Sequence, residues 1–428
     1  MLHLGIDRDA RRGLTAAVFG FLLDAYDLLL ILSIVPIIST IFAPQLTGSL
    51  AIIASLAALV IALISRPIGS LIFGYLADRI GRRRVLVITI LGFSLATFFT
   101  GVLPTYQQVG VLALILLYIV RAIQGIFIGG EYAAGNPFAL EFAPQNRRGL
   151  VSGLLAAAFD AGVLLSSLVV FLISSSMSRE DFINYGWRIA FFTGLIPAAL
   201  GLYIRLGVPE SRIWERIQEI RRKAQIQMSS TRISPWLYVS TSLLMAGFLY
   251  TYYSTVGFYS TLISNYLKYP VANASLVLTV TNGLILLAHL SSGILSDFVG
   301  RRPALILLGV LSIILAVPIF ITLPSIASDF NTLLITLAVI GAIVNSAYAI
   351  HAAYITESYP TLRRGLGYGL SYALGLIIGG SAPLILVPLG TALGSIFVAI
   401  AINIILGQLL VVGIALARPE TKGLSMER

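Results

Sequence analysis

The chain has 428 residues, of which 58% are hydrophobic and only 11% charged, and its mean hydropathy is +0.95. A soluble protein has roughly a quarter of its residues charged, so this composition excludes a water-soluble enzyme and indicates an integral membrane protein. The sequence contains no cysteine and three histidines, which excludes disulfides and thiolate chemistry and disfavours a metal centre. No metal or cofactor is expected.

Twelve apolar runs follow one another along the chain, each long enough to cross a bilayer as a helix of about 20 residues. The runs lack the strict alternation of apolar and polar residues that is typical of membrane strands. Their approximate bounds are 14–42, 48–77, 84–104, 109–142, 149–175, 187–208, 235–266, 271–296, 303–323, 331–358, 364–387 and 389–417. The sequence therefore predicts an all-α protein with twelve transmembrane helices.

The basic residues gather on one side of these predicted helices. If the helices alternate in direction, 23 of the 28 Lys and Arg residues lie on the side of both termini, whereas Arg179, Arg188 and Lys268 lie on the opposite side. Cytoplasmic loops of membrane proteins are enriched in Lys and Arg, so both termini are predicted to be cytoplasmic, with the protein in the cell membrane. The same asymmetry accounts for the net charge of +10 without nucleic acid as a partner.

A charged segment divides the chain into two parts with six predicted helices each. The predicted domains are 1–208, a cytoplasmic linker at 209–234, and 235–428. Within the linker Ile213, Ile217 and Ile220 follow helical spacing, which is typical of an amphipathic helix at the membrane surface. A solvated, charged linker is the alternative.

Three motifs of the first half recur in the second half in the same order. Residues 75–83, 141–149 and 209–211 correspond to residues 294–302, 357–365 and 419–421, at displacements of 219, 216 and 210 residues. Since each copy has six predicted helices, both have the same topology. The repeats are therefore expected to be parallel and related by an axis along the membrane normal.

These motifs carry a resemblance to a known family. Residues 74–83 (GYLADRIGRR) resemble the signature between the second and third helices of the major facilitator superfamily, and residues 419–423 (PETKG) are similar to its sugar-porter and metabolite–proton symporter branch. Residues 23–27 (LDAYD) and 129–132 (GGEY) are more similar to carriers of organic acids such as sialic acid and lactate. Residues 246–253 (AGFLYTYY) lack the paired glutamines of the hexose carriers. The resemblance implies two six-helix bundles that alternate in access.

Acidic residues lie beside arginines at the predicted cytoplasmic helix ends, at equivalent depths in both halves. If the halves rock against one another, such contacts form in one state and break in the other, which predicts a cytoplasmic gate. Charges that only set the membrane topology are the alternative. The candidate gate residues are Asp78, Arg79, Arg82, Arg83, Glu141, Arg147, Asp297, Arg301, Glu357 and Arg363.

Six charged residues fall deep within predicted helices of the first half. A charge at the middle of a membrane helix costs about 2.5–3.5 kcal/mol on insertion scales, so these side chains are expected to face the bundle interior. The acids outnumber the arginines, and a buried acid without a cation takes up a proton. This excess predicts proton coupling; a purely structural ion network is the alternative. The six residues are Asp24, Asp27, Arg66, Arg121, Glu131 and Asp160.

The resemblance assigns roles within this set. Asp27 follows a tyrosine as the proton-sensing aspartate of proton-coupled sugar porters does, and Arg121 takes the place of its arginine partner. Asp27 is therefore predicted to carry the proton, assisted by Asp24 or Glu131, and Arg121 to be its counter-ion and the anchor of a substrate carboxylate. The predicted substrate-binding residues are Arg121, Tyr253, Asn282 and Asn345. His289 and His351 are expected to be satisfied inside helices.

The sequence thus predicts a secondary transporter, not an enzyme, that moves a small organic anion together with protons by alternating access, as a monomer. No glycine-rich nucleotide-binding loop with a Lys-Ser or Lys-Thr end is present, which disfavours ATP-driven transport. A proton-coupled sugar or polyol porter and a non-transporting receptor with the same fold are the alternatives.

Overall fold

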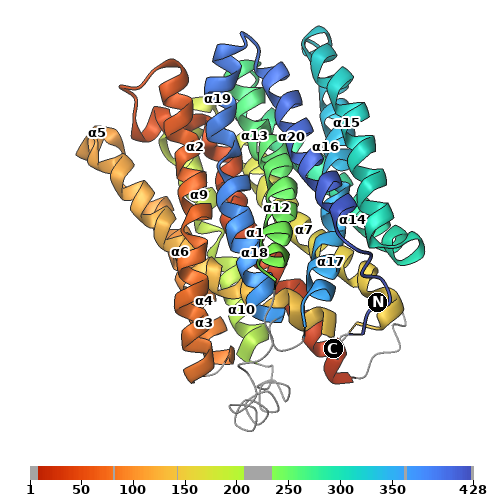
Figure 1. Ribbon diagram of the computed structural model, residues 1–428. Helices are drawn as coiled ribbons and strands as arrows, with labels where there is room; N and C mark the ends of the chain where they lie inside the picture. The colour runs from red at the N-terminus through yellow and green to blue at the C-terminus, as the bar shows by residue number, and fades with distance from the viewer. Residues whose placement is uncertain (1–7, 81, 142, 207–233, 361–363, 426–428) are drawn as a thin grey trace.

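The computed structural model describes residues 8–80, 82–141, 143–206, 234–360 and 364–425, and within these ranges the regular structure is entirely helical. The helices run along the long axis of the molecule (Figure 1), and the predicted all-α architecture with twelve transmembrane helices is confirmed. We call residues 8–206 the N-terminal half and residues 234–425 the C-terminal half. The linker predicted at 209–234, with its candidate amphipathic helix, lies almost entirely outside the described residues.

The N-terminal half consists of α1 (Arg8–Phe42), α2 (Gly48–Ile64), α3 (Arg66–Ile80), α4 (Arg82–Val102), α5 (Tyr106–Val109), α6 (Leu112–Glu141), η1 (Gln145–Arg147), α7 (Arg148–Ser175), α8 (Arg179–Asp181), η2 (Phe182–Gly186), α9 (Trp187–Phe192) and α10 (Leu195–Leu206). The C-terminal half consists of α12 (Pro235–Ser254), α13 (Val256–Thr261), η3 (Leu262–Tyr266), α14 (Val271–Val299), α15 (Arg301–Ile326), α16 (Phe330–Asn345), η4 (Ser346–Ile350), α17 (His351–Ser358), α18 (Arg364–Gly380), α19 (Ala382–Ala392) and α20 (Ile396–Ala417).

Among the described residues, nine helical segments are long and apolar enough to span a membrane by length and composition. The remaining three crossings are shorter or interrupted; the apolar part of α4, for example, is Val87–Val102. The nine long apolar helices of the described chain and these three shorter or interrupted crossings together make up the twelve crossings, in the order that the sequence predicts.

Several crossings are interrupted near their middle. The second crossing breaks between α2 and α3 at Ser65, two residues before Pro67, which has no N–H group for the helical ladder. The Ser65 hydroxyl donates to the Ile61 carbonyl at 2.8 Å. The seventh crossing breaks at Thr255, whose hydroxyl donates to the Thr251 carbonyl at 2.8 Å. Both break residues are buried, as expected, because lipid offers no partner for an interrupted backbone.

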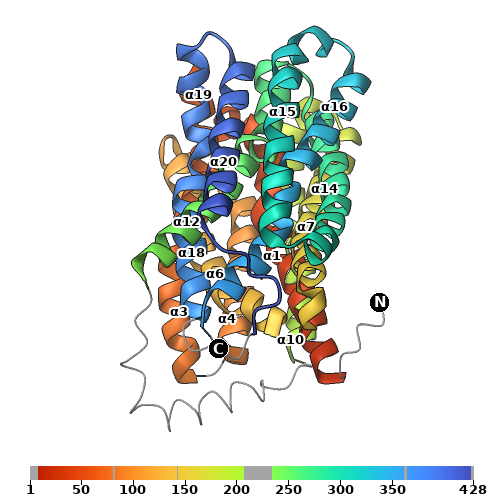
Figure 2. The same cartoon turned by 45° about the vertical axis from the view of Figure 1, so that its right-hand side comes forward.

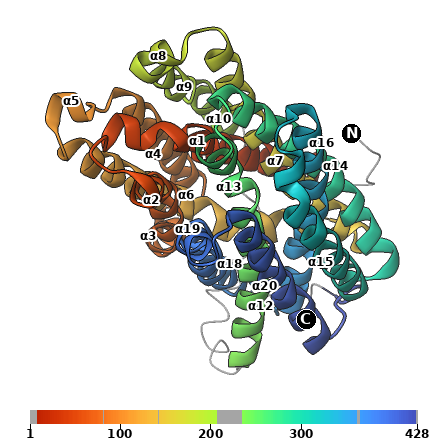
Figure 3. The ribbon, with the colours of Figure 1, turned by 90° about the horizontal axis from the view of Figure 1, so that it is seen from above.

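The two halves meet along α7 and α14, which make the most extensive helix–helix contact within the described chain and lie side by side in Figures 2 and 3. Glycines allow this close approach. A Cβ atom added to Gly153 would lie 2.5 Å from the His289 carbonyl oxygen, and one added to Gly293 would lie 2.4 Å from the Gly149 carbonyl oxygen. Small residues at such crossings let membrane helices pack backbone to backbone.

Contacts between the halves also occur at both ends of the bundle. We call the end that carries Arg148, Arg301 and Glu357 the basic end, and the opposite end the far end. At the far end the Ser260 hydroxyl of α13 donates to the Leu32 carbonyl of α1. Both described chain ends lie toward the basic end in Figure 1.

The packing of α6 against α2 makes a testable prediction. Gly125→Ala would place a Cβ atom 2.0 Å from the Ala62 carbonyl oxygen, and overpacking of this kind costs about 1–3 kcal/mol. We expect a lower thermal unfolding temperature in detergent, measured by loss of the monodisperse peak after heating. The matched control is Gly413→Ala in α20, where no heavy atom lies within 4 Å of the added Cβ. Equal unfolding temperatures for the two variants would contradict the close approach.

Candidate functional site

Asp27 lies on α1 inside the N-terminal half, and its side chain is completely buried. Its Oδ2 atom accepts a hydrogen bond of 2.8 Å from the Ser94 hydroxyl on α4. Within the described chain, no Arg, Lys or His forms an ion pair with Asp27. Asp24, one helical turn earlier, is equally buried. Asp27 is therefore held by a neutral donor, which suits a carboxyl group that gains and loses a proton.

Arg121 lies on α6 and belongs to the same hydrogen-bond network without touching the Asp27 carboxylate. Its guanidinium donates to the carbonyls of Ala58 and Leu28, each at 3.1 Å, and to the side chain of Gln124. Gln124 in turn donates to the Asp27 carbonyl at 3.1 Å. Arg121 thus fixes α6 against α1 and α2, one bond away from the backbone of Asp27. Its predicted roles as counter-ion and carboxylate anchor stay predictions.

Arg66 is a second buried cation, and it reaches into the opposite half. It is the first residue of α3, next to the break in the second crossing, and only 2% of it is exposed. Its guanidinium donates to the Tyr372 hydroxyl of α18 at 3.1 Å. Tyr253, buried on α12, lies within electrostatic range of Arg66, Tyr372 and Asp24. The structure therefore adds Arg66 and Tyr372 to the candidate site, at the interface between the halves.

The two predicted asparagines are buried in the C-terminal half. The Asn282 amide donates to the Leu278 carbonyl of its own helix, α14, at 2.7 Å. The Asn345 amide donates to the Gly341 carbonyl at 2.8 Å and to the Thr255 hydroxyl at 3.2 Å. Asn345 thereby connects the break in the seventh crossing to the end of α16, close to the irregular turn η4.

Asp160 and His289 form a pair that the sequence analysis did not predict. Oδ2 of Asp160 on α7 lies 2.5 Å from Nδ1 of His289 on α14, and both side chains are 1% exposed. The count of buried charges in the sequence weighed acids against arginines and so left Asp160 without a partner. His289, which lies within a predicted transmembrane helix of the other half, could have been considered as its partner.

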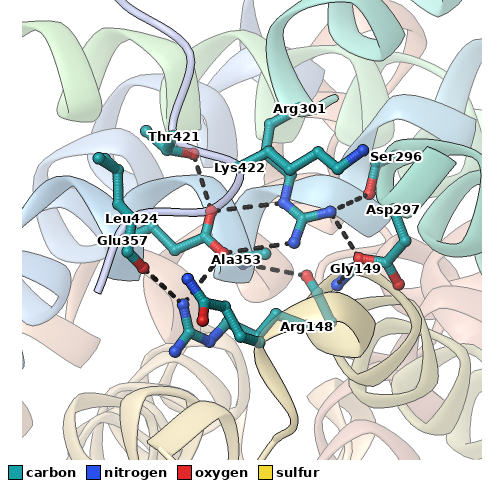
Figure 4. Close-up of polar contacts among 12 residues, drawn as sticks. Arg148, Gly149, Ser296, Asp297, Arg301, Ala353, Glu357, Thr421, Lys422 and Leu424 are labelled. Carbon is teal, nitrogen blue, oxygen red and sulfur yellow. Dashed lines mark hydrogen bonds and ion pairs between the residues drawn. The ribbon is translucent and has the colours of Figure 1, made fainter. Parts of the chain in front are cut away.

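A network of charges closes the basic end (Figure 4). The two carboxylate oxygens of Asp297, at the end of α14, accept hydrogen bonds of 2.8 Å from the backbone N–H groups of Gly149 and Leu150 in the first turn of α7. Arg301 donates to Asp297 at 2.7 Å and pairs with Glu357 at 3.3 Å. A carboxylate is favourable at this position because the first N–H groups of a helix lack intrahelical acceptors.

The segment after α20 binds to the same network. Thr421 donates to Glu357 at 2.8 Å. Glu420 accepts backbone hydrogen bonds of 2.9 Å from both Arg301 and Arg302 at the start of α15. Partial burial raises the pKa of Glu420, but these bonds, with those from the backbone of residues 421 and 422, outweigh it and leave that pKa lowered. The stabilisation is therefore present near neutral pH and is lost as the pH falls through the lowered pKa.

The structure describes the side chains of four predicted gate residues. Asp297, Arg301 and Glu357 lie together in the network, whereas Arg147 is exposed on η1. The neighbouring Arg148 is the residue beside Glu357, at 3.7 Å. The side chains of the other predicted gate residues lie outside the described part of the chain; these are Asp78, Arg79, Arg82, Arg83, Glu141 and Arg363. The same holds for Glu131, which was predicted to assist Asp27 in proton coupling.

Two known families match most of the chain. The family described as "Sugar (and other) transporter" matches residues 13–236, and the one described as "Major Facilitator Superfamily" matches residues 243–426. The chain belongs to the sugar (and other) transporter family of the major facilitator superfamily. The predicted superfamily is thereby confirmed, and the family's members are transporters.

The names of similar proteins give different transported compounds. The chain is 28% identical to the proline/betaine transporter of Escherichia coli over 88% of its own length and 77% of that protein. It is 29% identical to the shikimate transporter of Escherichia coli over 94% of its length and 92% of that protein. A solved proton:xylose symporter, bound to 6-bromo-6-deoxy-D-glucose, superposes with a TM-score of 0.78 at 21% identity, covering 98% of each chain. At this identity, the similarity to the solved symporter shows a shared fold.

The basic-end network of this transporter makes a testable prediction. Asp297→Asn removes one acceptor from the first turn of α7 and the ion pair with Arg301, so we expect the halves to separate more often at this end. Because the chain has no cysteine, nitroxide labels can be placed at Asn146→Cys and Gly365→Cys, both exposed. Pulsed electron–electron double resonance, which measures the distance between the two labels, should show a longer and broader distance distribution in the variant.

The control for this measurement is Asp329→Asn, which changes an exposed aspartate beyond the other end of the bundle. Asp329→Asn should leave the distances between the labels unchanged. If Asp297→Asn also leaves them unchanged, the network does not hold the basic end closed.

Proposed function

We propose that this protein is a proton-coupled symporter of small carboxylate-bearing metabolites, working by alternating access in the cell membrane with both termini in the cytoplasm. One observation carries the proposal. The N-terminal half holds a buried aspartate with a neutral hydrogen-bond donor and a buried arginine that bonds to the opposite half. Proton binding and anion binding can therefore both change the contact between halves. The basic residues at the end with both termini support the orientation.

Asp27 is the proposed proton carrier, with Asp24 and Glu131 assisting. A buried carboxylate without a paired cation is costly in an apolar interior, and protonation removes that cost. The Ser94 hydroxyl can donate to the ionised form and accept from the protonated form. Ionisation of Asp27 would also attract Arg121, whose bonds reach the backbone at Leu28. The protonation state of Asp27 would therefore affect the position of Arg121 and, with it, of α6.

Arg66 and Tyr372 are the proposed anchor for the substrate carboxylate, with Arg121 as the second candidate cation. A guanidinium binds a carboxylate through two parallel hydrogen bonds, and Arg66 lies where the two halves meet. Tyr253, Asn282 and Asn345 are proposed to contact the rest of the substrate.

The substrate class has support from the relatives' names. Proline, betaine and shikimate each carry a carboxylate, as do sialic acid and lactate, the organic acids that the sequence motifs favour. Xylose, for which the solved symporter is named, carries none. A sugar or polyol porter is the alternative function.

Asp27→Asn tests the proton carrier. An amide cannot bind and release the proton, so uphill accumulation driven by an imposed pH gradient should fall about tenfold or more, the equivalent of about 1.4 kcal/mol of coupling. Counterflow down the substrate gradient should continue. Both are measured in proteoliposomes, with Asp181→Asn as control; Asp181 is a half-buried aspartate of α8 that bonds to Ser178. Accumulation at the wild-type level in Asp27→Asn would exclude this role.

Arg66→Ala and Tyr372→Phe test the anchor. Loss of a charged partner of the carboxylate should raise the half-saturating substrate concentration by about tenfold or more, and loss of the hydroxyl by about threefold, as for one neutral hydrogen bond. The assay is counterflow across a panel of carboxylates and sugars, with internal pH monitored. Arg121→Ala is measured alongside, because it separates the two candidate cations. Uptake of sugars alone would support the porter alternative, and uptake of no compound in the panel would support a receptor.

A further inference from the structure

The pair formed by Asp160 and His289 joins the two halves at the middle of the seam between α7 and α14. It is buried, and its two residues lie 129 positions apart in the chain. The proposed function gives its two side chains no role, although the backbone carbonyl of Asn345, a proposed substrate contact, bonds to His289. Toward the basic end, the glycines of the seam bring the helices together; toward the far end, the hydroxyls of Ser167 and Thr279 lie 3.0 Å apart. The titratable pair is thus the central polar contact of this seam.

The hydrogen-bond partners of His289 fix how many protons the pair holds. Its Nε2 atom lies 3.0 Å from the Asn345 carbonyl oxygen, which can only accept, so Nε2 carries a hydrogen. Its Nδ1 atom lies 2.5 Å from Oδ2 of Asp160, a contact that needs a second hydrogen between the two atoms. Whether that hydrogen sits on nitrogen or on oxygen, the pair holds one proton more than an ionised aspartate beside a neutral histidine.

Loss of this proton leaves no arrangement that satisfies both sides of the ring. With the remaining hydrogen on Nε2, the lone pair of Nδ1 faces the carboxylate of Asp160. With the hydrogen on Nδ1, the lone pair of Nε2 faces the Asn345 carbonyl. Both side chains are nearly inaccessible to solvent, so water cannot relieve either contact while the helices stay together. Such unsatisfied buried polar groups are costly.

The other titratable groups around the pair come from three elements. Tyr252 of α12 lies within electrostatic range of Asp160. The Tyr348 ring of η4 lies 5.8 Å from the His289 ring and stacks on His351 of α17 at 4.0 Å. Within the described chain no Lys or Arg forms an ion pair with Asp160. Its salt-bridge partner there is therefore His289, and the proton is held between these two groups.

We propose that Asp160 and His289 form a second proton-binding site, in which one shared proton fastens α7 to α14 and its release to water separates the halves at this seam. The inference rests on the alternating movement in the proposed function, and it is independent of Asp27 and of the substrate. Since the basic-end network keeps its ion pairs as the pH rises, the separation is expected at the far end.

The test measures the distance between the halves as a function of pH. Nitroxide labels are placed at Leu50→Cys on α2 and Ile335→Cys on α16, which are 64% and 62% exposed, in protein without substrate. Between about pH 5 and about pH 9 a long-distance population should grow, and its ratio to the short-distance population should rise by about tenfold per pH unit, as for release of one proton. A distribution that is constant over this range would overturn the proposal.

Two variants identify the group that titrates. In Asp160→Asn the amide can donate to Nδ1 of neutral His289, so the bond needs no exchangeable proton, and the short distance should persist at every pH. The matched control Thr279→Val removes the neighbouring contact with Ser167 but no titratable group, and its transition should keep the wild-type midpoint. A full transition in Asp160→Asn would overturn the proposal.

A second measurement does not depend on the folding of a variant. The chain has three histidines, so ¹⁵N-labelled histidine gives a spectrum simple enough to assign with His351→Gln and His3→Gln. The Nδ1 signal of His289 should change with the same midpoint as the distance. A distance transition without any change at His289 would assign the proton elsewhere and overturn the proposal.

Repeating the distance measurement in Asp27→Asn separates this proposal from the proposed function. The transition should persist in Asp27→Asn even where gradient-driven accumulation is lost. If it disappears, the switching proton belongs to Asp27 and the second site is refuted. If accumulation is instead unaffected by Asp27→Asn while the transition persists, the role of Asp27 fails and the second site stands.

Discussion

Charge buried among apolar helices must be balanced inside the bundle, because lipid provides neither counter-ions nor hydrogen bonds. In this protein each described solution ties two or more helices together. Arg121 holds α6 to the backbone of α1 and α2, Arg66 reaches α18, and Asp160 meets α14. Two of these three contacts join opposite halves. The relative position of the halves therefore depends on the charge state of a few side chains.

The sequence predicts the crossings well, and three of the gate residues that it names lie together at the basic end. Apolar runs of membrane length leave little choice of structure, and the internal repeat singles out Asp297 and Glu357 as equivalents of acids in the first half. It names Arg147, whereas Arg148 lies beside Glu357, because adjacent residues of a helix end point in different directions and the start of α7 sets which one faces Glu357. Pairing across 129 residues, as for Asp160 and His289, leaves no local pattern at all.

The contacts of residues 419–423, which follow α20, explain what this motif does in the structure. In the sequence, residues 419–423 signal only a resemblance to a family. In the fold, Glu420 accepts from the first N–H groups of α15 and Thr421 donates to Glu357. The segment thus connects the end of the last crossing to the charges that bridge the halves. Movement at the basic end would therefore be transmitted to residues 420 and 421.

One contact at the basic end bears on how such a protein could arise. Asp297 accepts hydrogen bonds from the start of α7, so a helix of one half is capped by a residue of the other. Two copies of a single six-helix unit could exchange this cap reciprocally as a dimer, since the halves carry corresponding motifs at equivalent places. Joining the copies into one polypeptide would then require no new interface, because duplication and fusion would preserve a bond that already existed between subunits.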